Sequence, residues 1–203
     1  MPQLLDMVTL VAPFAPNVPA FTAANAIRDS ARHFFKETFA YQMEIELDVE
    51  AGVKKYPLDL FFSDVEIVST LEIKTANGKP LSHLPNEPER DTKGSPIGYL
   101  GSFDRHIVLH PTPNEAQSLT VKVAVRPRFD AEDIEDSVFG VNAEGLRWGA
   151  LAILKKQPGT DWFSPAEVSY YEDLFLDAIN KRAYEVRLNN MPNNMRLDIP
   201  SFN

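Results

Sequence analysis

The stretch SPAEVSYYEDLFLDAINKRAYEVRLNN, residues 164–190, predicts a long helix near the end of the chain. Ser164 is suited to the N-cap, Pro165 to the first helical position, and Glu167 completes a capping box. We expect the helix to end at Asn189 and Asn190. One side of it carries, at helical spacing, Val168, Tyr171, Phe175, Ala178, Ile179 and Arg182.

A second helix is predicted just before it, in NAEGLRWGALAILKK, residues 142–156. Asn142 is a good N-cap residue, and Glu144 lies in the first turn, where the helix dipole favours an acid. Gly145 and Gly149 destabilise a helix interior, so their spacing of four predicts a smooth face that another backbone approaches closely.

The first helix of the chain is expected in PAFTAANAIRDSARHFFKETFAY, residues 19–41. Pro19 precedes it, and we expect Thr22 to cap it. Its apolar face has helical spacing and consists of Ile27, Ala31, Phe34, Phe35 and Thr38.

Strand patterns fill the interval between the first and second helices. QMEIELDVEAG alternates strictly, and so does SLTVKVAVRP, as expected for strands with one buried face. VEIVSTLEIKTANGKPL predicts a strand followed by an Asn-Gly turn, and HIVLH predicts a further strand. The polar, proline-rich SHLPNEPERDTKGSP predicts a long loop.

These patterns predict an α+β fold: a small bundle of one N-terminal and two C-terminal helices, with an inserted antiparallel β-subdomain. For 203 residues a single domain is the expectation. The predicted parts are an N-terminal arm (1–18), the helical bundle (19–41 and 142–188), the β-subdomain (42–129), an acidic connector (130–141) and an extended C-terminal tail (189–203).

The composition excludes some classes of function. The chain has no cysteine, which excludes disulfides and thiolate chemistry and fits a reducing compartment. No apolar run approaches the roughly 20 residues of a membrane span. The N-terminus lacks the basic region of a signal peptide. The net charge is −9, and residues 130–144 hold six acids and no Lys or Arg, which argues against binding to a phosphate backbone.

The four histidines do not form a metal-ligand pattern. His106 and His110 are four residues apart, but in a strand that spacing puts their side chains about 13 Å apart. His33 lies in the first helix and His83 in the proline-rich loop, so a transition-metal site is not expected.

The remaining chemical motifs are also missing. The acid run lacks the pattern of a calcium loop, GSPIGYLG is no phosphate-binding fingerprint, and no GxSxG occurs. Asp104 and Arg105 are expected to shape a turn. Paired acids for glycoside hydrolysis stay open, because any two acids of a chain can meet in the folded state.

A succession of short motifs from Pro19 to Leu188 carries a family resemblance. A proline-led helix ends in HFFKETFAY, a strand follows near AGVKKYPL, and GSPIGYL leads to a strand ending in IVLHPTP. LTVKVAVRP follows, and GALAILKKQPGTDWFSPAEVSYYEDLFLDAI gives a helix, a turn and a last helix. In this order the motifs resemble the head-to-tail adaptor (connector) proteins of tailed bacteriophages, the class that includes tail tubular protein A.

The resemblance implies a structural protein of the virion neck, made in the host cytoplasm. Such adaptors form a ring of twelve copies beneath the portal protein, continue the DNA channel without sequence-specific binding, and present a platform to the next tail or collar protein. The resemblance carries no catalytic residue, metal or cofactor with it, and implies no membrane partner.

Two segments are candidates for that work. The tail holds large apolar residues that a disordered terminus usually lacks, and we expect it to dock on the portal or on a neighbouring copy. This candidate interface consists of Arg187, Leu188, Met191, Met195, Leu197, Ile199 and Phe202. A frayed terminus is the alternative.

The acids of the connector are the second candidate, because an acidic channel wall would let DNA slide. The candidate lumen acids are Asp130, Glu132, Asp133, Glu135 and Asp136. A solvated loop is the alternative. For the whole chain the alternatives are a tail-completion or terminator protein, and a carbohydrate-binding β module or virion enzyme.

Overall fold

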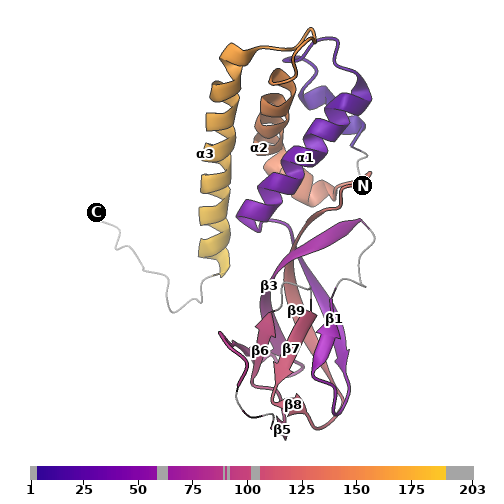
Figure 1. The fold of residues 1–203 in the computed structure, drawn as a ribbon, viewed down its shortest axis with the longest axis vertical. Coiled ribbons are helices and arrows are strands. Elements are labelled where there is room, and N and C mark those ends of the chain that lie inside the picture. Colours follow the sequence, from indigo (N-terminus) through magenta and orange to yellow (C-terminus); the bar gives the residue numbers. More distant parts are fainter. Residues whose placement is uncertain (1–3, 59–63, 89, 91, 102–105, 191–203) are drawn as a thin grey trace, which may run out of the picture. The chain divides into compact units, whose positions relative to one another are not determined.

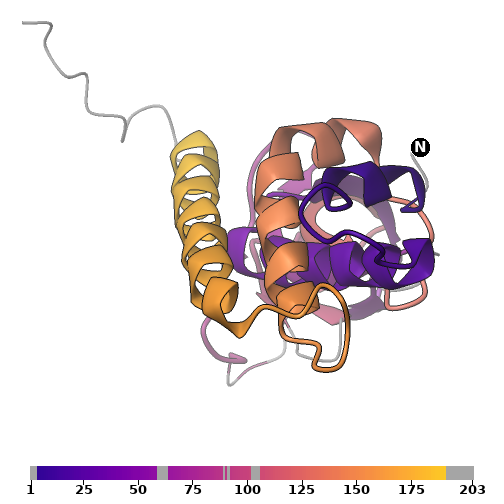
Figure 2. The same ribbon diagram turned by 90° about the horizontal axis from the view of Figure 1, so that it is seen from above.

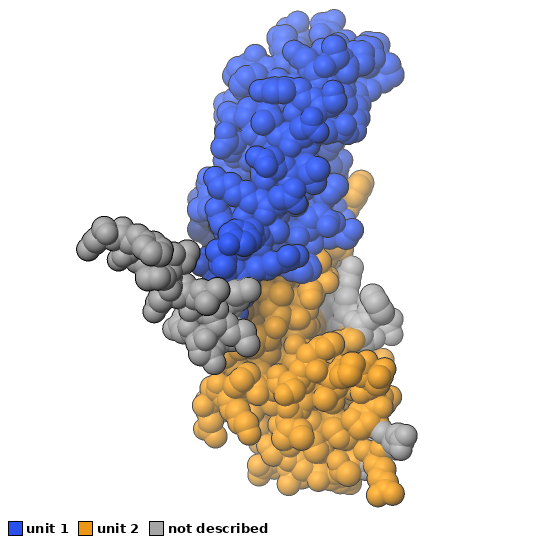
Figure 3. Space-filling view, turned by 90° about the vertical axis from the view of Figure 1, so that its left-hand side faces the viewer, with its two compact units in different colours: residues 1–40, 133–203 blue, residues 41–132 orange. Residues whose placement is uncertain are grey.

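A computed structural model describes residues 4–58, 64–88, 90, 92–101 and 106–190 (Figure 1). The chain divides into two compact units, one of residues 1–40 with 133–203 and one of residues 41–132 (Figure 3). The first unit is helical and the second is built of strands, so the predicted α+β fold, with the β part inserted between helices, is confirmed.

Three helices and a short 3-10 helix form the helical unit. They are η1 (Asp6–Leu10), α1 (Ala20–Thr38), α2 (Asp136–Lys155) and α3 (Pro165–Asn190). The central helix, α2, packs against both α1 and α3, and α3 runs alongside it after a short connection (Figures 1 and 2). The described part of the N-terminal arm belongs to this unit, because Met7, Val11 and Ala15 are buried.

Gly145 and Gly149 of α2 allow close packing, as their spacing predicts. A Cβ added at Gly149 would lie 2.2 Å from Ser30 Oγ and 2.7 Å from a ring carbon of Phe175. One at Gly145 would lie 2.7 Å from the ring of Phe34. Because the helices are this close, Ser30 Oγ donates a hydrogen bond to the Leu146 carbonyl at 2.8 Å. Both neighbouring helices therefore approach α2 where it lacks side chains.

Two predicted helix starts are wrong. No side-chain hydrogen bond caps α1, and its N-cap is Pro19 rather than Thr22. The second helix begins at Asp136, so half of the predicted acidic connector forms its first turns. Asn142 is consequently an interior residue, and its Nδ2 donates to the Val138 carbonyl. An acid in a first turn is favourable, which accounts for the earlier start.

The sheet with the longest strands is antiparallel, with β9 (Gln117–Pro127) between β1 (Gln42–Val49) and β3 (Val65–Thr75). Its alternation is confirmed, since one face of β1 and β9 is buried through Ile45, Leu47, Val49, Leu119, Val121, Val123 and Val125. The Asn-Gly turn after β3 is also present, with Gly78 at φ 75° and its N–H donating to the Thr75 carbonyl.

A second sheet has the order β2 (Lys55–Pro57), β7 (His106–His110), β6 (Gly98–Gly101) and β4 (Ser82–His83). The pairings of β7 with β2 and β6 are antiparallel, whereas β4 pairs with β6 in parallel. The short strands β5 (Lys93–Gly94) and β8 (Thr112–Pro113) are also parallel. The prediction of an antiparallel subdomain is therefore correct for the long strands, but it did not include the parallel pairings of β4 with β6 and of β5 with β8.

Replacing Gly149 tests the close packing of α2. We expect Gly149→Leu to lower the free energy of unfolding by about 1–3 kcal/mol or more, because the added atoms would overlap Ser30 and Phe175. Gly140→Ala is the matched control in the same helix, since a Cβ there meets nothing within 4 Å. It should raise stability by up to about 1 kcal/mol. Urea titration measures both, and equal effects would contradict the packing account.

Candidate assembly surfaces

The histidines lie among packed rings and along one strand. His33 meets the ring of Phe175 edge-on, with centroids 5.4 Å apart, and His83 meets Tyr99 in the same way at 5.3 Å. His106 and His110 stand at the two ends of β7, as the strand prediction requires. Within the residues described, no three His, Cys, Asp or Glu side chains are grouped so that they could hold a metal ion.

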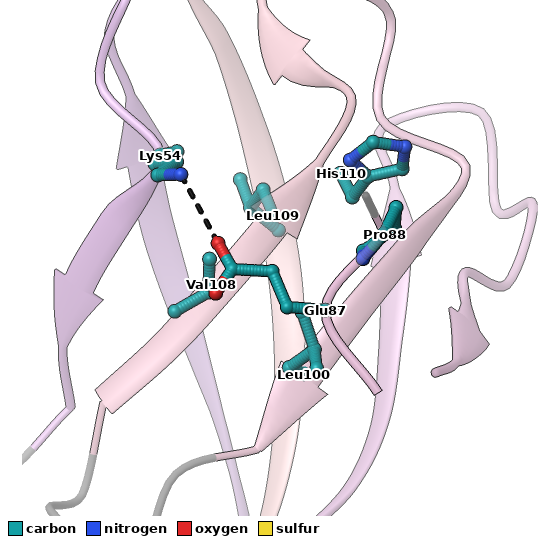
Figure 4. A pocket seen from close by; sticks show the side chains of 7 residues that line it. All are labelled: Lys54, Glu87, Pro88, Leu100, Val108, Leu109 and His110. Atoms are coloured by element: carbon teal, nitrogen blue, oxygen red, sulfur yellow. Dashed lines mark hydrogen bonds and ion pairs between the residues drawn. The ribbon is translucent and has the colours of Figure 1, made fainter. Parts of the chain in front are cut away.

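A small hollow in the β unit lies beside β7 (Figure 4). Its volume is about 10 Å³, and the ion pair between Lys54 Nζ and Glu87 Oε1, 3.2 Å apart, lies across it. Leu100, Val108 and Pro88 also line it. A space of this size holds about one water molecule, so the hollow is too small for a substrate.

The perturbed titrating groups have structural causes. Burial raises the pKa of Tyr56, Tyr99 and Tyr171. The hydroxyl of Tyr56 donates to the Val53 carbonyl at 2.9 Å and accepts from the Glu50 N–H at 3.0 Å, so it holds the turn after β1. The hydrogen bond to Glu72 raises the pKa of Lys74.

The junction of α2 and α3 is held by an ion pair. Lys155 is only 7% exposed, and its Nζ lies 2.6 Å from Glu167 Oε2. This hydrogen bond lowers the pKa of Glu167. The Ser164 N–H donates to the Lys155 carbonyl at 3.1 Å. Glu167 thus lies in the first turn of α3, as predicted, and neutralises a buried lysine. The predicted capping box is not formed, because the Ser164 N–H donates to Lys155 instead of to the Glu167 carboxylate.

The candidate lumen acids are divided between the two units. Asp130 and Glu132 belong to the β unit and are exposed, and Asp130 pairs with Arg128 at 3.4 Å. In the helical unit, Glu135 is the N-cap of α2 and Asp136 is exposed in its first turn. Asp133 is half-buried, and its Oδ1 has no hydrogen-bond partner in the described part of the chain.

Most of the candidate tail interface lies outside the described residues. The interface residues outside the described part of the chain are Met191, Met195, Leu197, Ile199 and Phe202. Asp104 and Arg105, which are expected to shape a turn, also lie outside it. Arg187 and Leu188 are exposed in the last turn of α3. They therefore present a basic and an apolar side chain where the tail begins.

An apolar side of α3 was missed by the sequence prediction. Of its 26 residues only Tyr171, Ile179 and Val186 are buried. Large side chains elsewhere on the helix are exposed: Tyr170, Leu176, Tyr184 and Leu188. The signal was present in the sequence, because these residues fall off the predicted core face. Exposed aromatic and apolar groups of this kind mark protein contacts.

A groove between α2 and α3 was also missed. Its volume is about 280 Å³, and it is lined by residues of both helices and by Phe34 of α1. Apolar residues of the lining include Val141, Trp148 and Leu174, and charged residues include Glu144 and Asp177. Only the packed structure reveals it, since the lining comes from three helices.

No protein-family model matches the chain, and the search of curated proteins finds no match. Among the described helices, none is both long and apolar enough to cross a bilayer.

The ion pair at the helix junction gives a pH-dependent stability. Because the folded pKa of Glu167 is lowered from 4.5, its contribution is full above that pH and is lost as the pH falls through the folded value. We expect Glu167→Gln to be less stable than the parent at pH 6, with a difference that shrinks below pH 4.5. Lys155→Met removes the other partner of the ion pair, so it should abolish the same pH-dependent contribution to the free energy of unfolding. Urea titrations from pH 6 to pH 3 measure this, and a difference unchanged at pH 3 would contradict it.

Proposed function

We propose that the chain is a head-to-tail adaptor of a tailed bacteriophage. It forms a ring that joins the portal protein to the tail and continues the DNA channel. The observation that carries the proposal is the architecture: a helical unit from the two ends of the chain, with an antiparallel β unit inserted between α1 and α2. This is the arrangement implied by the motif order that resembles the adaptors.

The exposed side of α3 supports an assembling role. A closed ring of identical copies needs two different surface patches on each subunit. Tyr170, Leu176 and Tyr184 supply large apolar groups on one helix, which suits a contact with another protein. Leu188 continues this surface to the point where the tail begins.

Charge supports passage of DNA rather than its capture. The net charge of −9 opposes tight binding to phosphates, which depends on clustered cations. We propose that acids among Asp130, Glu132, Asp133, Glu135 and Asp136 face the channel. The proposed function is structural and requires no catalytic residue, cofactor or metal. Its place is the virion neck, with the portal on one side and a tail or collar protein on the other.

Deleting the tail tests the proposed contact with the portal. The chain cut after Asn190 retains all three α-helices and all three sheets of the described residues. We expect it to keep the circular dichroism of the full chain but to lose co-sedimentation with the cognate portal ring by at least tenfold, because the apolar anchors are gone.

The matched control is the full chain with Arg196→Ser, which keeps every apolar residue of the tail. It should bind the portal nearly as well as the parent. Undiminished decoration of portal rings by the truncated chain would overturn the tail contact. A full chain that never binds the portal would overturn the adaptor function.

A further inference from the structure

The groove between α2 and α3 has a lining of both apolar and polar residues and no occupant among the described residues. Phe34, Gly145 and Ala178 line it beside Trp148, Val141 and Leu174, over a volume of about 280 Å³. Val141 is 69% exposed. A hollow of this size holds a few side chains, so its lining exposes apolar surface that a docked segment would cover.

Two polar groups in the lining are left without partners. Asn142 is only 4% exposed, and its Nδ2 donates to the Val138 carbonyl, yet its Oδ1 has no hydrogen-bond partner in the described chain. Arg182 Nη1 donates to Glu185 Oε2 at 3.0 Å, and its buried Nε is likewise unpaired there. Both atoms are themselves buried, so they lie behind the lining and are not part of the surface that an occupant of the groove would contact.

The rim has charges of both signs. Asp177 and Lys181 line the groove, are exposed and lie one helical turn apart. Among the ion pairs of the described residues, neither takes part in one. An occupant with one basic and one acidic side chain would match this rim.

The C-terminal tail has the chemistry that the groove requires. Its sequence, MPNNMRLDIPSFN, has two carboxamides between Met191 and Met195, followed by Arg196 and Asp198. The apolar side chains suit the apolar part of the lining, and the two charges suit the rim.

The tail also begins at the right place. The groove extends along α3 from Glu185 back to Leu174, about 16 Å at 1.5 Å per residue. Asn190, where the helix ends, is about 7.5 Å beyond Glu185. The thirteen residues 191–203 span up to about 43 Å when extended. The tail is therefore long enough to turn back and fill the groove beside its own helix.

We propose that the tail of each subunit docks into the α2–α3 groove of the same subunit. The short connection favours its own groove over that of another copy, because it gives an effective concentration on the order of millimolar. The regulatory consequence rests on the proposed function: the docked tail is withheld from the portal until the portal displaces it.

Cysteine pairing tests the docking in the full chain, which has no cysteine of its own. We expect Val141→Cys with Met195→Cys to form an intramolecular disulfide under mild oxidation at micromolar protein. The matched control is Phe21→Cys with Met195→Cys, since Phe21 is 70% exposed on α1 and does not line the groove. The groove pair should close at least tenfold faster, as read by mass spectrometry and non-reducing gels.

A second set of variants removes the anchors. Leu197→Asp and Ile199→Asp in the groove-pair background should slow closure severalfold, because the docked tail loses apolar contact. Equal rates for the groove pair and the control pair would overturn the proposal. Predominantly covalent dimers would also overturn it, since the occupant would then be the tail of another copy.

Portal binding separates this inference from the proposed function. The disulfide-closed chain should not bind the portal, and reduction should restore binding. Rapid closure in a chain that never binds the portal would leave the docking intact and overturn the adaptor function. Slow closure in a chain whose portal binding depends on the tail would overturn the docking and leave the adaptor function intact.

Discussion

The close approach of α1 and α3 to Gly145 and Gly149 of α2 is the contact on which the helical unit depends. At Gly149 the neighbouring atoms lie closer than any Cβ would allow, and beside it the hydroxyl of Ser30 reaches the backbone of α2. Two helices packed this tightly against a third fix which side of α3 is buried. The rest of α3, with its tyrosines and leucines, is consequently left outward. Gly145 also lines the groove, and because it has no side chain it leaves that space open. One packing constraint thus contributes both to the outward side of α3, which we assign to assembly, and to the groove, which we assign to the tail.

Shape and charge then work together in the proposed adaptor. We propose that its contacts come from apolar groups on a single helix and from the tail that follows it. In the same proposal the acids of residues 130–136 oppose the capture of DNA. The ion pair between the buried Lys155 and the exposed Glu167 ties the start of α3 to the end of α2. It keeps the helix that bears these contacts in place.

The strands and the existence of three helices could be predicted from the sequence, because alternation and helical spacing follow directly from burial. Ile45, Leu47 and Val49 are buried as their alternation requires. Gly145 and Gly149 meet close neighbours as their spacing requires. Helix starts were less predictable. Asn142 has the properties of a cap, but its amide bonds to Val138 inside the helix. Of the candidate site, Arg187 and Leu188 are exposed as an interface needs, whereas the groove depends on residues far apart in sequence and could not be foreseen. The five apolar tail residues and the family resemblance stay predictions.

The mass of the protein in solution, measured with and without the cognate portal, tests the central claim most directly. If the chain acts as one subunit of a ring, the purified protein alone should remain a small species. With the portal it should form a complex whose mass fits an integral, symmetric set of copies. A chain that keeps the mass of a single copy of 22.8 kDa in the presence of the portal would contradict the account.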